Sequence, residues 1–215
     1  MESQRLLRFL RLLEKIPENV RLIAVSKGQS LEKIKAALQA GQKDFGENYA
    51  QELIEKASAF TNEKAGEKIT WHFLGHLQKN KLPKVLGVIA WLHSLDSLTL
   101  AEAIHKRMQA PLKCLLEINL AEEKTKTGLS PQEALELIPK LTPLTNIDLK
   151  GLMTMSPSVH FKKLFSLLKE INQRYLYPRP LTELSMGMSG DFEAAIKEGA
   201  TMVRIGTAIF GERKI

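Results

Sequence analysis

The stretch Arg-Leu-Ile-Ala-Val-Ser-Lys at residues 21–27 is a short apolar run that ends in a lysine. The run predicts a buried β-strand, and Lys27 would stand where that strand ends. An amine that emerges from an apolar strand can lose its charge by desolvation and attack a carbonyl to form a Schiff base. Taken alone, however, a lysine at a strand end is usually a solvated amine with a buried stem.

A second informative region lies near the end of the chain. It contains Leu-Ser-Met-Gly-Met-Ser-Gly-Asp at residues 184–191 and Val-Arg-Ile-Gly-Thr-Ala-Ile-Phe-Gly at residues 203–211. Turns that contain glycine at helix starts present clustered backbone N–H groups, which favour phosphate. A reactive amine and an anion site in one chain would suit a phosphorylated aldehyde such as pyridoxal phosphate (PLP).

Between these regions, short apolar runs alternate with segments of helical period. Eight strands are expected, at residues 22–26, 44–45, 70–73, 89–93, 112–119, 147–153, 181–184 and 202–205. Seven helices are expected between them, at residues 31–40, 49–60, 78–85, 98–108, 131–141, 161–175 and 189–198. Such alternation indicates parallel pairing, and eight units of this kind close into an α/β fold, the TIM-type (β/α)8 barrel. An open doubly wound sheet is the alternative.

A barrel would also define where the site lies. Active sites of this fold collect at the carboxyl ends of the strands, and phosphate sites commonly use the loops after strands seven and eight. Lys27 ends the first expected strand, residues 185–189 follow the seventh, and Gly206 and Thr207 follow the eighth. Because closure makes the first and last strands neighbours, we expect these groups to lie close together.

Length and composition limit the class of protein. The chain has 215 residues, of which 44% are hydrophobic and 26% charged, as in a soluble globular protein. No Gly/Ser-rich linker divides it, so we expect one domain over residues 1–215. The longest purely apolar run, residues 88–92, is far shorter than the roughly 20 residues that span a bilayer. We expect no membrane segment and a cytoplasmic location, with organelle targeting by the basic amphipathic start as an alternative.

The formal net charge of +7 would suit an anionic ligand, an acidic partner or nucleic acid. The lysines are scattered, however, with only small clusters such as Lys124 and Lys126, and no aromatic residues interleave with them. Stacking platforms of that kind are typical of nucleic-acid sites, so we expect ordinary solvated faces and no nucleic-acid partner.

Metal and thiol chemistry are not expected. His72 and His76 have the spacing of helical metal ligands, but residues 71–73 indicate a strand and Gly75 a turn, which excludes that geometry. Cys114 is the only cysteine and lies in an apolar strand candidate, which favours an inert buried thiol. We therefore predict no metal and assign Cys114 no role.

Several longer motifs resemble those of one known family, the pyridoxal phosphate homeostasis proteins, whose fold is similar to the N-terminal barrel of alanine racemase. They occur in the family's order and extend over residues 21–213. The motifs include Ala-Val-Ser-Lys (24–27), Phe-Gly-Glu-Asn-Tyr-Ala-Gln-Glu (45–52), Trp-His-Phe-Leu-Gly-His-Leu-Gln-Lys-Asn-Lys (71–81), His-Ser-Leu-Asp (93–96), Lys-Gly-Leu-Met-Thr-Met (150–155) and Leu-Ser-Met-Gly-Met-Ser (184–189).

The resemblance implies roles for particular residues. It implies that Lys27 forms the Schiff base with PLP and that Arg204 faces the pyridine nitrogen. It also implies that Ser185, Gly206 and Thr207 hold the phosphate. For Asn48 two roles stay open: contact with the cofactor or its lysine, and capping of the helix expected from residue 49.

A guanidinium at the ring nitrogen disfavours protonation of the pyridine, which makes the cofactor a poorer electron sink. We therefore expect a cytoplasmic, monomeric protein of vitamin B6 homeostasis that buffers or carries PLP without robust catalysis and passes it to PLP-dependent apo-enzymes. A small PLP-dependent amino-acid racemase is the alternative, although no second base is expected. Another is an interaction protein with a vestigial cofactor site.

Overall fold

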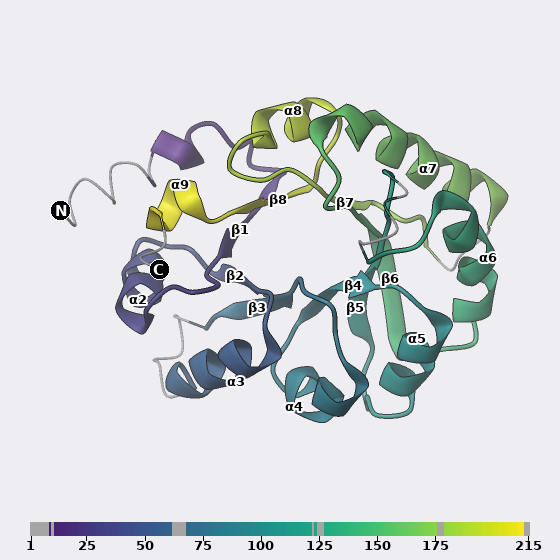
Figure 1. Ribbon diagram of the computed structural model, residues 1–215, viewed down its shortest axis with the longest axis horizontal. Helices are drawn as coiled ribbons and strands as arrows, with labels where there is room; N and C mark the ends of the chain where they lie inside the picture. The colour runs from purple at the N-terminus through teal and green to yellow at the C-terminus, as the bar shows by residue number, and fades with distance from the viewer. Residues whose placement is uncertain are drawn as a thin grey trace.

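The computed structural model describes residues 9, 11–61, 68–121, 123, 127–175 and 179–212. Within these residues, eight parallel strands close into a barrel in chain order (Figure 1). The strands are β1 (Arg21–Val25), β2 (Asp44–Glu47), β3 (Thr70–Phe73), β4 (Trp91–Leu95), β5 (Leu112–Glu117), β6 (Ile147–Met153), β7 (Glu183–Ser185) and β8 (Met202–Ile205).

Closure of the barrel rests on the pairing of its first and last strands. Arg21 lies opposite Met202 and Ala24 opposite Ile205, both in parallel register. The (β/α)8 prediction is thereby confirmed, and the open doubly wound sheet is wrong because such a sheet leaves its edge strands unpaired. The pairing brings residues about 180 positions apart in sequence to one side of the barrel.

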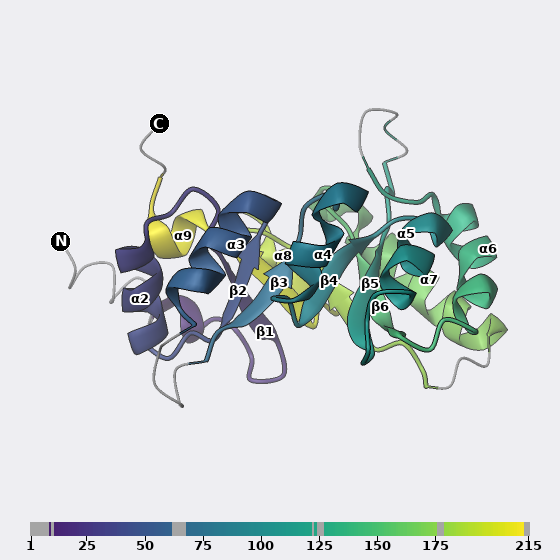
Figure 2. The ribbon, with the colours of Figure 1, turned by 90° about the horizontal axis from the view of Figure 1, so that it is seen from below.

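Helices surround the barrel on its outside (Figures 1 and 2). Ser130 and Glu133 form a reciprocal capping box at the start of α6, with Pro131 in its first turn. The helices are α2 (Leu31–Gln39), α3 (Ala50–Ala59), α4 (Leu82–Leu86), α5 (Leu98–His105), α6 (Pro131–Leu141), α7 (Phe161–Arg174), α8 (Phe192–Lys197) and α9 (Thr207–Phe210), with 3₁₀ turns at Lys79–Lys81 and Ser158–His160.

Some expected boundaries are wrong by a few residues. The helix expected from residue 189 begins only at Phe192, because the backbone N–H of Met188 donates to Oδ1 of Asp191 at 2.7 Å. That bond holds residues 188–191 in a turn instead of a helix. Strand β1 ends at Val25, so Lys27 lies two residues beyond it, in a loop.

The core has two layers, because successive strand residues point alternately inward and outward. Outward-facing residues such as Leu92 and Val203 pack under the helices. A smaller apolar group fills the barrel interior and consists of Ile23, Trp91, Leu115, Met153 and Met202. Polar side chains share that interior, among them His93 and Arg204.

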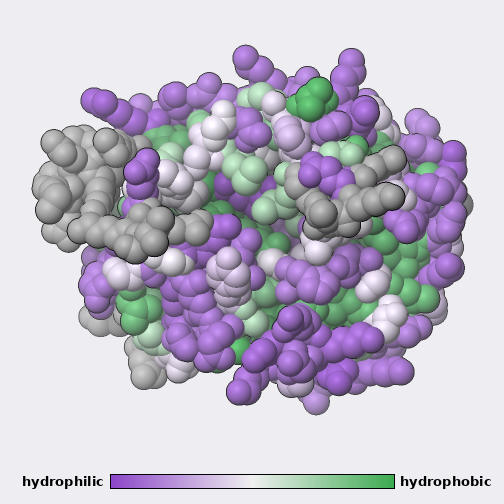
Figure 3. All heavy atoms as spheres, in the orientation of Figure 1, coloured by the Kyte–Doolittle hydropathy of each residue, from purple (hydrophilic) through white to green (hydrophobic). Residues whose placement is uncertain are grey.

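The expectation for Cys114 can be compared directly with the structure. Cys114 is buried, and burial raises the pKa of its thiol, as expected for an inert cysteine. Among the described residues, no helix combines the length and apolar character needed to cross a membrane. Hydrophilic side chains cover much of the face in Figure 3. The cluster of Lys124 and Lys126 lies outside the described residues.

Candidate functional site

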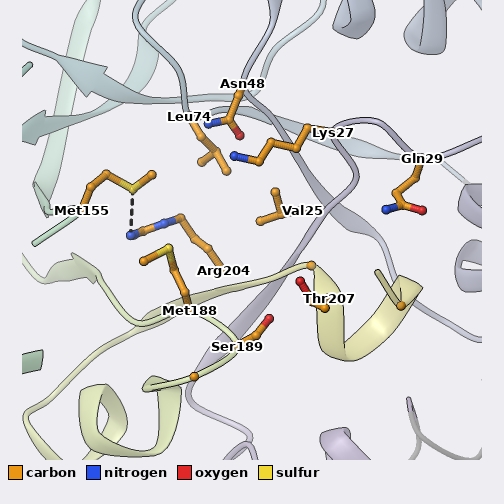
Figure 4. Close-up of a pocket in the computed structure, with 13 residues that line it drawn as sticks. Val25, Lys27, Gln29, Asn48, Leu74, Met155, Met188, Ser189, Arg204 and Thr207 are labelled. Atoms are coloured by element: carbon orange, nitrogen blue, oxygen red, sulfur yellow. Dashed lines mark hydrogen bonds between the residues drawn. The ribbon is translucent and has the colours of Figure 1, made fainter. Parts of the chain in front are cut away.

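A cavity of about 270 Å³ opens at the carboxyl ends of the strands. Ligand sites of (β/α)8 barrels lie at this end, and a volume near the lower limit of roughly 300 Å³ for such sites suits one small ring compound. Five of the six predicted site residues share the cavity (Figure 4). Its wall consists of Val25, Lys27, Gln29, Asn48, Leu74, Met155, Met188, Ser189, Gly190, Arg204, Gly206, Thr207 and Gly211.

Lys27 is half-buried, and its side chain extends into the cavity from the loop after β1 (Figure 4). Asn48 lies beside it, just after β2. Helix α3 begins at Ala50 with no side-chain cap, so the capping role considered for Asn48 is wrong. The buried Oδ1 of Asn48 has no hydrogen-bond partner among the residues that the structure describes. Asn48 therefore offers an acceptor to a ligand in the cavity.

A buried cluster from β2 and α3 holds the loop that carries Lys27. Lys56 Nζ donates to the carbonyl oxygen of Ser26 at 2.5 Å, to Glu47 Oε1 at 2.7 Å and to Glu52 Oε1 at 2.6 Å. Glu52 Oε1 also accepts from the backbone N–H of Gly28 at 2.5 Å. Ser26 Oγ donates to Glu47 at 2.7 Å. Both residues that flank Lys27 are thus fixed by ionic hydrogen bonds.

The sequence pattern did not predict this cluster. Burial raises the pKa of the Glu47 carboxyl, while the neighbouring Lys56 and Ser26 oppose that rise. The sequence does indicate one of its ion pairs, because Glu52 and Lys56 have the i, i+4 spacing of a helical pair. That spacing usually marks a solvated surface pair, however, and only the fold shows that Lys56 is buried.

Arg204 lies across the cavity from Lys27 and is 2% exposed (Figure 4). Its Nη1 donates to Ser185 Oγ at 2.7 Å, and its Nη2 donates to the carbonyl oxygen of Thr154 at 2.7 Å. The buried Nε has no partner within the described part of the chain. Desolvation lowers the pKa of Arg204 to about 10, so the guanidinium stays charged at neutral pH.

Ser185 is the one predicted site residue that does not line the cavity. It is fully buried, and its Oγ is bonded to Arg204 and to His93 Nδ1, at 2.7 and 2.9 Å. The cavity contains Ser189 instead. Gly187, with φ of +88°, turns the chain after β7 in a conformation that favours glycine and brings the following residues over the cavity. The structure therefore places Ser189, and not Ser185, where a hydroxyl could contact a phosphate in this cavity.

Gly206 and Thr207 form part of the same wall as Ser189. Gly206 precedes the short helix α9, and Thr207 is its first residue. The hydroxyls of Ser189 and Thr207 face each other along this side of the cavity (Figure 4). The first N–H groups of a helix lack intrahelical partners, and they add donors to these hydroxyls. This wall is suited to an anionic group.

A second cavity of about 300 Å³ adjoins the first and shares Asn48, Leu74 and Met155 with it. His76 lines it and contacts Asp96 at 3.1 Å, whereas His72 is bonded inside the barrel, so the two histidines do not converge on a metal. Glu117 also lines this cavity, and burial raises the pKa of its carboxyl.

Comparison with known proteins identifies the class. The family model described as alanine racemase, N-terminal domain, matches residues 5–214. Solved alanine racemase from Clostridium difficile has the same fold, with a TM-score of 0.78 at 16% identity, over 97% of this chain and 57% of that one. The chain belongs to the alanine racemase N-terminal domain family, and within it to the pyridoxal phosphate homeostasis proteins.

Three relatives illustrate the second assignment. The pyridoxal phosphate homeostasis protein of Vibrio alginolyticus is 39% identical over 208 residues, which are 92% of this chain and 88% of that protein. The protein of the same description from Homo sapiens is 39% identical over 210 residues, or 90% and 76%. PipY of Synechococcus elongatus PCC7942, solved with PLP bound, has a TM-score of 0.88 at 36% identity, covering 96% of this chain and all of that one.

Proposed function

We propose that this protein binds PLP as a reversible Schiff base on Lys27 and serves vitamin B6 homeostasis as a buffer or carrier, without robust catalysis. The proposal is based on one small cavity whose wall contains an amine (Lys27), a buried cation (Arg204) and a surface suited to an anion. A single domain over residues 1–215, a cytoplasmic location, a monomeric state and PLP-dependent apo-enzymes as recipients belong to the same proposal.

The residues present fit PLP. Lys27 would hold the aldehyde carbon, and Arg204 would face the pyridine nitrogen with its unpartnered Nε. Ser189, Gly206 and Thr207 would hold the phosphate. Bound PLP supplies an electron sink for carbanion chemistry. Arg204 limits that chemistry, because a second positive charge on the ring nitrogen would lie beside a desolvated guanidinium.

The cavity wall also argues against a racemase. Racemisation needs proton-transfer groups on both faces of the substrate, and the described wall of the first cavity contains no histidine, tyrosine or carboxylate. Lys27 is the only titratable amine in that wall. Release of PLP needs only water or another amine to attack the Schiff base, so a carrier functions without a second base.

The test is to incubate the purified protein with PLP, reduce with borohydride and locate the modified peptide by mass spectrometry. We expect a single adduct on Lys27 that is unchanged when the exposed Lys84 is replaced by alanine. Adducts spread over surface lysines would contradict the proposal and favour the vestigial-site interpretation. Steady turnover of an added amino acid, well above that with free PLP, would contradict the carrier role.

The phosphate wall gives a separate prediction. Ser189→Ala and Thr207→Val should each weaken PLP binding about 10- to 150-fold, because a hydrogen bond to a charged group contributes about 1.5–3 kcal/mol. Binding of pyridoxal, which lacks the phosphate, should change by less than about twofold in each variant. Titration of both compounds measures the ratio. Equal losses for PLP and pyridoxal would mean that this wall does not hold the phosphate.

Removal of the buried guanidinium should also weaken binding. Arg204→Met should lower PLP affinity by about tenfold, because the donor to the ring nitrogen is lost. Unfolding free energy of the protein without PLP should change by less than about 1.5 kcal/mol, since the lost hydrogen bonds are offset by relief from burying a charge. Fluorescence titration and denaturant unfolding measure the two effects. Unchanged affinity would show that Arg204 does not contact the ring.

A further inference from the structure

Polar side chains occupy the centre of the barrel, where branched apolar residues usually pack. His72 in β3, His93 in β4, Ser185 in β7 and Arg204 in β8 are each at most 2% exposed. The indole of Trp91 stacks on His72, with ring centroids 5.9 Å apart and planes within 8°. Burial of polar groups costs free energy unless each one is hydrogen-bonded, and here the bonds form one continuous series.

The series runs through the barrel from the cavity to the opposite end. Arg204 Nη1 is 2.7 Å from Ser185 Oγ, which is 2.9 Å from His93 Nδ1. His93 Nε2 is 2.9 Å from His72 Nδ1, and His72 Nε2 is 2.8 Å from Asp44 Oδ1. Asp44 is the first residue of β2, at the amino end of the barrel, and its side chain is 25% exposed.

The direction of these hydrogen bonds follows from the chemistry at both ends. A guanidinium only donates, so Ser185 Oγ accepts from Arg204, and its single O–H is available to donate to His93 Nδ1. A carboxylate only accepts, so His72 Nε2 carries the proton that is shared with Asp44. The remaining bond then requires His93 Nε2–H to donate to His72 Nδ1. The carboxylate end therefore sets one tautomer for two neutral imidazoles, with the proton on Nε2, and the hydroxyl of Ser185 is able to match it at the other end.

We propose that Asp44, His72, His93 and Ser185 act as one oriented hydrogen-bond chain that positions Arg204 for the cofactor ring from the far end of the barrel. This inference rests on the proposed function. Ser185 and Thr154 anchor the two terminal nitrogens of the guanidinium, which leaves Nε for the ring nitrogen. Burial lowers the pKa of both imidazoles, in agreement with the neutral tautomers that the geometry requires.

Two physical consequences of this chain of hydrogen bonds distinguish a positioning role from simple packing. Aligned hydrogen bonds polarise one another, so the negative charge of Asp44 strengthens each donor back towards Arg204. An added proton on either imidazole would replace an acceptor by a donor and break the series. Replacement of Asp44 should therefore weaken the hydrogen bonds that position Arg204, although the carboxylate lies at the other end of the barrel.

The first experiment is ¹⁵N NMR of the histidine-labelled wild-type protein without PLP. We expect His72 and His93 both to be neutral, with the proton on Nε2. A proton on Nδ1, or an imidazolium, at neutral pH would overturn the proposal. This measurement needs no variant and no cofactor, so its failure is distinct from a failure to bind PLP.

The second experiment compares Asp44→Ala with Asp148→Ala. Asp148 is a matched control, because it lies near the amino end of β6 with a side chain 33% exposed and pairs with Lys150 instead of joining the chain. Asp44→Ala should weaken PLP binding at least threefold, within the roughly 2- to 30-fold range of such coupling. Asp148→Ala should change it less than about twofold.

The Asp44→Ala variant should also change the tautomer of His72 in the NMR spectrum. Equal PLP affinities for the two variants, with wild-type binding intact, would refute the positioning role while leaving the PLP site in place. If Asp44→Ala does not fold, His72→Gln should be compared with wild type in the same titration. Wild-type affinity in that folded variant would refute the proposal equally.

Discussion

Replacement of Lys27 by alanine should lower PLP affinity by at least about 100-fold, equivalent to about 2.8 kcal/mol. The covalent bond to the aldehyde is lost. The contacts with Arg204 and with the phosphate wall (Ser189, Gly206 and Thr207) remain and account for the residual binding. The visible absorbance of the Schiff base should disappear altogether. Absorbance titration and equilibrium dialysis with PLP measure the two effects.

Lys27→Arg is the matched control, because it keeps the positive charge and most of the side-chain length but cannot form a Schiff base. It should behave like Lys27→Ala in absorbance. Lys27 is half-buried in a loop, so the unfolding free energy without PLP should change by less than about 0.5 kcal/mol in either variant. A retained Schiff-base absorbance in Lys27→Ala would assign the site to another lysine.

Lys56→Met should have the largest effect on stability, lowering the unfolding free energy by about 3–5 kcal/mol. Methionine keeps the apolar stem but leaves the fully buried Glu47 without its cation. It also removes the donor to the Ser26 carbonyl, next to Lys27. Urea unfolding measures the loss, with the exposed Lys84→Met as control.

The pH dependence of Lys56→Met gives a further check on its cause. Without Lys56, the already raised pKa of Glu47 should rise further, because burial is no longer opposed by the cation. A carboxyl with a raised pKa in the folded state stabilises the fold below its unfolded pKa of about 4.3 and loses that contribution as pH rises. The stability deficit should therefore shrink as pH falls towards about 4. A deficit independent of pH would indicate a packing defect instead.

The same variant tests how Lys27 is held. Lys56→Met removes the hydrogen bond from Lys56 to the carbonyl oxygen of Ser26, which precedes Lys27. PLP binding should therefore weaken even where the protein remains folded. Adding Glu47→Gln to Lys56→Met should recover part of the stability, because the uncompensated charge is removed. If the double variant is no more stable than the single one, the buried ion pair is not the source of the loss.

Local pattern was sufficient to predict much of the fold. The alternation of apolar runs and helical segments predicted all eight strands, with errors of a few residues at strand ends and at the start of α8. The helix expected from residue 131 does begin there, at Pro131 after the cap Ser130, because capping depends on neighbours in sequence. Lys27, Gly206 and Thr207 were placed together because strand ends converge in a closed barrel.

Ser185 and Ser189 show where local pattern was insufficient. Both serines lie in one Gly-containing segment whose composition is typical of a phosphate-binding turn. The sequence does not show which of the two hydroxyls faces a ligand. The positive φ of Gly187 and the inward position of Ser185 in β7 decide the matter. A hydroxyl at one position bonds Arg204 inside the barrel, whereas the hydroxyl four residues later lines the cavity.

By itself, the sequence determined the order of the strands along the chain, the lysine just after the first strand and the arginine in the last, because these depend on short-range periodicity. Only the tertiary structure decided that Lys56 is buried against Glu47 and that Arg204 connects through His93 to Asp44. Those contacts join residues up to 92 positions apart. Their energies depend on burial and on the direction of side chains, which exist only once the barrel has closed.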